Sequence, residues 1–185
     1  MSAPIVLAHG IAPFDAPYRP LLNIGLRKLF NPHDKFDYFN GIASHLCHHG
    51  YTVFAPRVPF AADVEHRAAK LKDHVNSILT QTDADKVHII AHSMGGLDAR
   101  HMIVNGEMAD RVATLTTTGT PHRGTSFADV GLAKAGWLIG LLGAFKLDIA
   151  GFSNLSTEDT AAFNEQALDA EAQNPVHYTT YAASQ

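Results

Sequence analysis

The segment that most constrains this fold is an apolar run that ends near a serine and turns through two glycines. Residues 87–91 read Val-His-Ile-Ile-Ala, which predicts a buried strand. Gly95 and Gly96 follow Ser93 after one intervening residue, and the apolar residues over 97–103 predict a helix. A strand, a tight turn and a helix in this order hold a serine hydroxyl at an exposed point. We therefore expect Ser93 to be a nucleophile, the alternative being a serine that caps a buried helix.

The turn departs from the usual pattern by one small residue. Glycine normally stands two residues before and two residues after such a serine. Here Ala91 takes the first place and Gly95 keeps the second. Alanine is the mildest departure available, so the tight turn is still expected.

Composition is that of an ordinary globular protein. The chain has 185 residues, of which 46% are hydrophobic and 17% charged, and this suits one domain with a sizeable core. The formal net charge of −4 argues against nucleic acid as a partner and against attraction to an anionic membrane. The single cysteine, Cys47, cannot form an internal disulfide, which fits a reducing compartment. It is expected to be a small core residue rather than a reactive thiol.

The start of the sequence as written predicts a cytoplasmic protein. Residues 1–4 hold no basic region, and the apolar run over 5–8 is too short for a signal peptide. A mature secreted form would begin in the same way, so secretion remains an alternative. The most apolar later stretch, residues 136–145, is too short and too glycine-rich for a membrane span.

Short apolar runs alternate with helical patterns, which predicts an α/β fold with a mostly parallel sheet and helices on both faces. Strands are expected over residues 5–8, 52–55, 87–91, 112–118 and 176–182. The clearest helix follows Asp63, which stands in a capping position, and carries an apolar stripe to Ile78. Further helices are expected after Ser156 and over residues 41–49, the latter ended by Gly50.

A serine nucleophile builds negative charge on the carbonyl oxygen that it attacks, so the site needs two donors aimed at that oxygen. The backbone N–H of Met94 is one candidate, because the start of a helix also favours an anion through its dipole. The backbone N–H of Ile11 is the other candidate, because Gly10 lets the backbone after the first strand approach closely. The alternative is that His9-Gly10 is only a turn that ends this strand.

Four segments of the chain resemble, in order, those of triacylglycerol lipases of the α/β-hydrolase fold. They are Pro4 to Gly10, Ala91 to Leu97, Gly119 to Thr125 followed by Phe127-Ala128-Asp129, and Leu155 to Asn164 followed by Val176-His177-Tyr178. The Thr-Pro-His-Arg-Gly sequence in the third segment narrows the resemblance, because thioesterases and acyltransferases share the serine turn. The resemblance implies a carboxylic ester hydrolase that forms an acyl-enzyme on Ser93, with a lipid or small ester as substrate and no metal or other cofactor.

The resemblance also implies a catalytic acid and base after the last matched segment, whereas the sequence stops at Gln185. We therefore expect the C-terminal part of the fold to be missing, as in a fragment of a longer lipase. The alternatives are a base elsewhere in these residues, a thioesterase or acyltransferase, and a non-catalytic lipid-binding fragment. His122 is the best base within the chain, since it follows a strand and lies at the sheet edge of Ser93. The resemblance gives its loop a structural role, and neither Asp129 nor Asp148 has a positional argument as the acid.

The remaining histidines are expected to be structural. His45, His48 and His49 have a helical spacing that could hold a metal, but no carboxylate or second cysteine joins them, so a solvated helix face is expected. His92 adjoins Ser93, and its side chain should diverge from that of the serine. Four more are expected on the surfaces of helices or strands: His66, His74, His88 and His101.

Residues 130–145 are apolar over more of their circumference than a surface helix needs, which predicts a lid region over 126–150. A lid could cover an apolar groove in water and open in transient contact with a lipid surface. The alternative is a buried core helix or a helix at a dimer contact. We treat residues 1–185 as a single domain and expect an unpaired apolar sheet edge to favour a homodimer.

Overall fold

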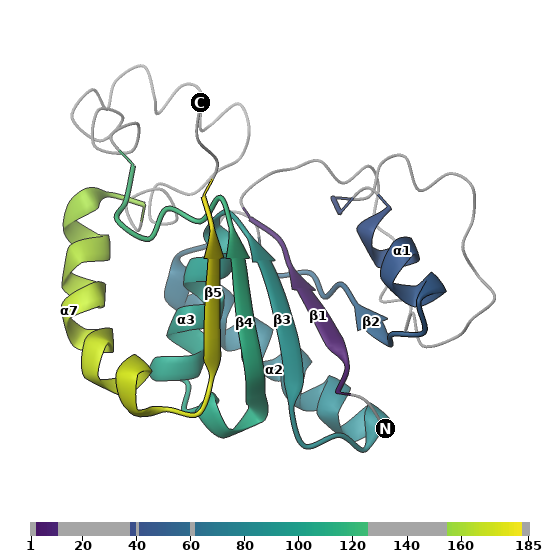
Figure 1. The fold of residues 1–185 in the computed structure, drawn as a ribbon. Coiled ribbons are helices and arrows are strands. Elements are labelled where there is room, and N and C mark those ends of the chain that lie inside the picture. Colours follow the sequence, from purple (N-terminus) through teal and green to yellow (C-terminus); the bar gives the residue numbers. More distant parts are fainter. Residues whose placement is uncertain (1–2, 11–37, 40, 60–61, 126–154, 183–185) are drawn as a thin grey trace.

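The computed structural model describes residues 3–10, 38–39, 41–59, 62–125 and 155–182, which form one α/β sandwich (Figure 1). Five parallel strands make one sheet in the order β2-β1-β3-β4-β5. The strands are β1 (Ile5–Ala8), β2 (Val53–Phe54), β3 (Val87–His92), β4 (Val112–Thr118) and β5 (His177–Tyr181). The helices are α1 (Ile42–His48), α2 (Val64–Thr82), α3 (Met94–Val104) and α7 (Thr157–Gln173). The expected lid region and the candidates Ile11, Asp129 and Asp148 lie outside the described residues.

Two strands are shorter than the sequence pattern predicts. β2 pairs with β1 only through Val53 and Phe54, because the chain soon reaches Pro56, which has no N–H to extend the ladder. β5 begins one residue late, because the N–H of Val176 donates to the side chain of Asn174 at 3.0 Å. The strand over 112–118 is confirmed at both ends.

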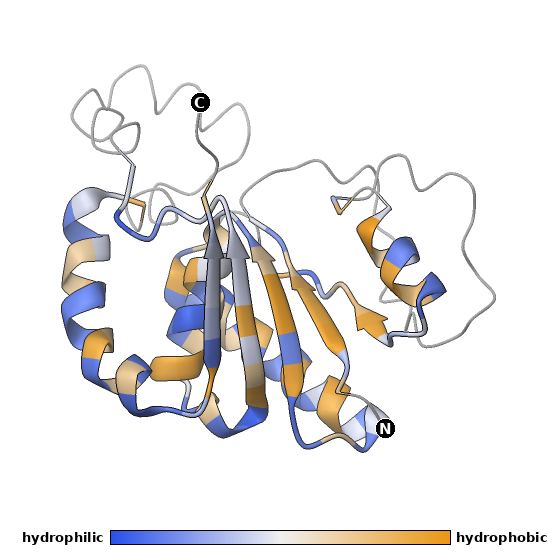
Figure 2. Cartoon of the chain, viewed as in Figure 1, coloured by the Kyte–Doolittle hydropathy of each residue, from blue (hydrophilic) through white to orange (hydrophobic). Residues whose placement is uncertain are grey.

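Alternate residues of β1 supply the cores on the two faces of the sheet. Val6 and Ala8 belong to the larger cluster, which α2 and α3 cover. Ile5 and Leu7 point the other way, into a smaller cluster that includes Ala43 of α1. Figure 2 shows this apolar character along β1, β2 and β3. The expected arrangement, a parallel sheet with helices on both faces, is confirmed.

The expected helix caps are also confirmed. The Asp63 carboxylate accepts the N–H of His66 at 2.7 Å at the start of α2. The Ser156 hydroxyl accepts the N–H of Asp159 at 3.1 Å at the start of α7. Gly50 follows α1 with φ at +89°, the left-handed conformation that ends such a helix.

The outer strand β5 differs from the apolar edge that we expected. All five of its residues are exposed, and it reads His-Tyr-Thr-Thr-Tyr, which Figure 2 draws in hydrophilic to neutral colours. Tyr181, for example, is 63% exposed. The described part of the sheet therefore ends in a polar and aromatic strand, and homodimer formation remains a prediction. Within the same residues, no helix combines the length and the apolar character that crossing a membrane requires.

Candidate active site

Ser93 occupies a strained turn between β3 and α3. Its φ and ψ angles are 54° and −133°, a conformation that residues with a side chain rarely adopt. Contacts on both sides hold it: its N–H donates to the carbonyl of Thr118 at 3.1 Å. Its own carbonyl accepts the hydroxyl of Thr120 at 2.8 Å and the N–H of Gly96 at 3.0 Å. The turn that the sequence predicts is therefore formed at the carboxyl edge of the sheet.

Glycines bring the end of β1 and the start of α3 against this serine. A Cβ atom on Gly10 would lie 2.6 Å from the Ser93 Cβ and 3.0 Å from its Oγ. A Cβ atom on Gly95 would lie 2.7 Å from the carbonyl oxygen of His9. Neither approach leaves room for any side chain larger than hydrogen. His9-Gly10 is thus more than a turn that ends a strand, because it brings backbone into contact with Ser93.

The first turn of α3 offers a backbone donor beside Ser93. The N–H of Met94 belongs to the first four of the helix, which no intrahelical carbonyl can accept. The N–H of Gly10 is engaged, since it donates to the hydroxyl of Tyr38 at 2.9 Å. The second expected donor, on Ile11, follows Gly10 and lies outside the described residues.

Tyr38 is a site residue that the sequence analysis missed. Its hydroxyl oxygen accepts the Gly10 N–H and lies 2.6 Å from Nδ1 of His92. Burial raises the pKa of Tyr38, although the Gly10 hydrogen bond and the charge of Arg67 both lower it, so the phenol is protonated at neutral pH. No sequence signal marks Tyr38, because it lies far from the serine and outside any strand or helix pattern.

The His9 ring positions its own loop. The N–H of Val58 donates to Nε2 of His9 at 3.1 Å, so this nitrogen carries no proton. The proton of the neutral ring is on Nδ1, 2.9 Å from the carbonyl oxygen of Gly10, to which it donates. Both ring nitrogens therefore bond to backbone.

Arg67 of α2 and Asp98 of α3 form a buried ion pair that the sequence analysis also missed. Their side chains are 0% and 1% exposed, and the closest approach is 2.7 Å between Nη2 and Oδ2. Burial raises the pKa of Asp98 to about 6, against the opposing effect of Arg67. The available signal was a charged residue among the apolar residues of each helix: Arg67 beside Val64 and Ala68, and Asp98 beside Leu97.

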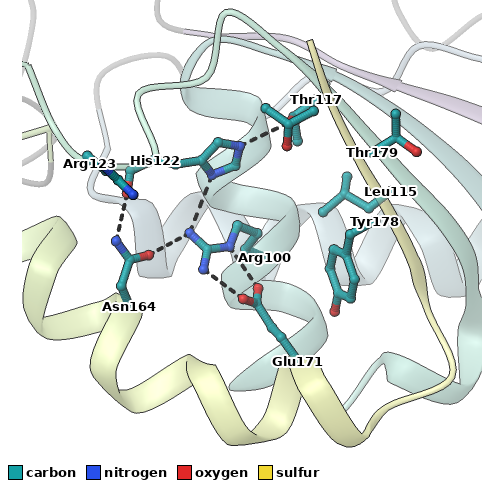
Figure 3. A pocket seen from close by; sticks show the side chains of 10 residues that line it. Arg100, Leu115, Thr117, His122, Arg123, Asn164, Glu171, Tyr178 and Thr179 are labelled. Carbon is teal, nitrogen blue, oxygen red and sulfur yellow. Dashed lines mark hydrogen bonds and ion pairs between the residues drawn. The ribbon is translucent and has the colours of Figure 1, made fainter. Parts of the chain in front are cut away.

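His122 lies in a second polar cluster, drawn in Figure 3. This cluster lines a cavity of about 360 Å³ between α3, α7, β4 and β5. Arg100 donates to both carboxylate oxygens of Glu171 at 2.7 and 2.8 Å and to Asn164 at 2.9 Å. It also lies 3.4 Å from Nδ1 of His122, whose Nε2 lies 2.9 Å from the Thr117 hydroxyl.

These contacts give His122 a structural role. A guanidinium group only donates, so Nδ1 of His122 accepts and its proton is on Nε2, facing Thr117. Burial, and then the charge of Arg100, lower the pKa of His122. Among the described residues, no hydrogen bond joins His122 to Ser93. The structure therefore gives no support to His122 as the base.

The other histidines mostly lie where the sequence predicts. His45 and His48 of α1 are exposed, as is His49 directly after it, and within the described residues no group of three or more His, Cys, Asp or Glu side chains could bind a metal. The expectation was wrong for His101, whose ring stacks on Phe163 at 3.7 Å where α7 crosses α3. Burial, and then Arg100, lower the pKa of His101 to about 4. Burial raises the pKa of the Cys47 thiol, as befits a partly buried packing residue.

Comparison with known proteins now identifies the class to which this arrangement belongs. The model of the alpha/beta hydrolase fold matches residues 3–176, so the chain belongs to the α/β-hydrolase family. A triacylglycerol lipase of Pseudarthrobacter phenanthrenivorans is 37% identical over 129 residues, covering 68% of this chain and 35% of the relative. A triacylglycerol lipase of Pseudomonas fragi is 29% identical over 184 residues, covering 88% of this chain and 57% of the relative.

The resemblance to triacylglycerol lipases is thereby confirmed. The chain spans about a third of the length of the first curated relatives that it matches. Among solved structures, the mature form of a Bacillus licheniformis lipase superposes with a TM-score of 0.70 at 23% identity, covering 96% of this chain and 64% of that one. At that identity the likeness shows the fold alone, and it confirms the expected α/β-hydrolase fold.

Proposed function

We propose that this chain carries the nucleophile and oxyanion hole of a carboxylic ester hydrolase of the lipase type, with Ser93 as the nucleophile. The observation that carries the proposal is the strained backbone of Ser93 at the end of β3, faced by Gly10 without an intervening side chain. Strain of this kind persists only where the surroundings hold it, and it is common at catalytic residues. The relatives named triacylglycerol lipase support an ester as the substrate.

The proposed reaction proceeds in two steps. The Ser93 Oγ attacks the ester carbonyl carbon while a base takes its proton, and negative charge develops on the carbonyl oxygen. The N–H groups of Met94 and Ile11 stabilise that oxyanion. The bond to the alcohol oxygen then breaks, and the alcohol leaves with the proton. Water hydrolyses the acyl-enzyme and restores the serine.

The substrate is a lipid or a small ester, and the catalytic acid and base are supplied by residues other than the described histidines. We assign homodimer formation to the sheet edge at β5. We assign contact with a lipid surface to the apolar residues 130–145. A thioesterase or acyltransferase on the same scaffold is the second candidate, because it would use the same serine turn.

Hydrolysis of a short-chain nitrophenyl ester tests the proposal, with the Ser93→Ala variant assayed beside the wild-type chain. Turnover that the variant abolishes supports a Ser93 hydrolase. A series of acyl chain lengths, with acyl-thioesters in parallel, separates a lipase or esterase from a thioesterase. A folded chain that binds lipid without turnover would favour a non-catalytic lipid-binding role instead.

A further inference from the structure

The Arg67 guanidinium connects two helices to two backbone segments. It donates to both carboxylate oxygens of Asp98, with distances from 2.7 to 3.1 Å. Its Nη1 donates to the carbonyl of Pro59 at 2.8 Å, in the segment that leads into α2. Its Nη2 donates to the carbonyl of His9 at 3.0 Å, directly after β1. One side chain of α2 therefore contacts α3 and both of these segments.

The His9 carbonyl is the point at which this contact reaches the candidate active site. Gly10 follows it, and the place of a Gly10 Cβ is 2.6 Å from the Ser93 Cβ. The same carbonyl oxygen lies 2.7 Å from the place of a Gly95 Cβ, in the first turn of α3. A shift of His9 would therefore displace the Gly10 backbone that faces Ser93.

A buried ion pair of this kind is by itself weak evidence of a stabilising role. Taking two charges out of water costs more than their attraction returns unless further hydrogen bonds compensate. Burial raises the pKa of the Asp98 carboxyl by more than Arg67 lowers it. The further hydrogen bonds that compensate here are those to the carbonyls of Pro59 and His9. They fix backbone position, and a planar fork of five donors is suited to that task.

We infer that the Arg67–Asp98 pair positions the backbone of His9 and Gly10, directly after β1, against Ser93, so that Arg67 and Asp98 are positioning residues for the candidate active site. The inference rests on the proposed function, because a fixed loop matters to catalysis only if Ser93 is the nucleophile. The positioning itself is a property of the folded chain, and it is measured without any turnover.

Hydrogen exchange at the Gly10 amide measures this positioning, because that N–H donates to Tyr38 and is protected while the loop is in place. Arg67→Lys keeps the charge but loses the fork of donors. We expect it to speed exchange at Gly10 by about tenfold relative to the amides of β4, the effect of losing one charge-assisted hydrogen bond. Asp98→Asn, which preserves side-chain size, should act in the same direction.

Arg100→Lys is the matched control. Like Arg67, Arg100 donates to both oxygens of a carboxylate, that of Glu171, but it lies on α3 and contacts the cluster around His122. Its loss should change exchange at Gly10 by less than about threefold. Equal protection of Gly10 in Arg67→Lys and Arg100→Lys would overturn the inference.

The wild-type chain supplies a readout if the Arg67 variants do not fold. In urea below the unfolding transition, the Gly10 amide and the Arg67 guanidinium protons should exchange through one common opening. Exchange of Gly10 while the Arg67 protons stay protected would refute the inference.

Labelling of Ser93 by a fluorophosphonate in the same variants keeps the two proposals apart. If the wild-type chain labels, Arg67→Lys should slow labelling more than Arg100→Lys does. A wild-type chain that does not label, with Gly10 still loosened in Arg67→Lys, counts against a Ser93 that this chain alone can activate and leaves the positioning role supported.

Discussion

Acidification should weaken the packing of α7 on α3 through His101. Its neutral ring stacks on Phe163 at 3.7 Å, and its pKa falls to about 4 from an ordinary value of 6.5. Between these values the unfolded chain binds a proton at His101 that the folded chain does not, so the contribution of His101 to stability rises with pH from about 4 to 6.5 and is constant above. A shift of this size corresponds to at most about 3 kcal/mol. Because the ring is partly exposed, solvent screening reduces this to about 1 to 2 kcal/mol.

Urea unfolding at a series of pH values from 4 to 7 measures this contribution. His101→Phe keeps an aromatic ring against Phe163 but cannot take up a proton, so its stability should vary less over this range than that of the wild type. His48→Phe changes an exposed histidine and serves as the control. The difference between wild type and His101→Phe isolates His101 from the carboxylates that titrate over the same range. A difference that is flat from pH 4 to 6.5 would refute the stated burial of a neutral His101.

Three further substitutions test the site, the core and a helix start. Gly10→Ala should lower the reactivity of Ser93 by about 100-fold, the effect of displacing one oxyanion donor, and labelling at the wild-type rate would count against the close contact. Leu71→Ala removes a side chain that is 1% exposed and should lower the free energy of unfolding, measured in urea, by about 3 kcal/mol. A loss below about 1 kcal/mol would place Leu71 outside the core. Asp63→Ala removes the cap of α2 and should cost about 1 kcal/mol by the same assay, with no change arguing that the 2.7 Å bond is not populated.

The sequence predicts those parts of the fold that local patterns control. The run over 112–118 is a strand because its residues are apolar or β-branched, and Asp63 and Ser156 start helices because their oxygens accept the first free N–H groups. Ser93 could be singled out for the same reason, since the strand, the serine and the glycines are contiguous. The short β2 was less accurately predicted, because a proline shortly after an apolar run limits its pairing.

The contacts that were missed all join residues distant in the sequence. Tyr38 reaches Gly10 across 28 residues, Arg67 reaches His9 across 58, and His101 meets Phe163 only after α7 has folded back onto α3. No local pattern specifies such pairs, because they depend on how the elements pack. The same holds for His122, which lies at the expected sheet edge but contacts Arg100 and Thr117.

Covalent labelling is the most direct test of the central claim that Ser93 is the nucleophile. The chain is treated with a fluorophosphonate, and intact mass followed by peptide mapping locates any adduct, with Ser93→Ala treated in parallel. The account predicts a single adduct on Ser93 that is absent from the variant. An adduct on another residue, or equal labelling of the folded wild type and the variant, would contradict it.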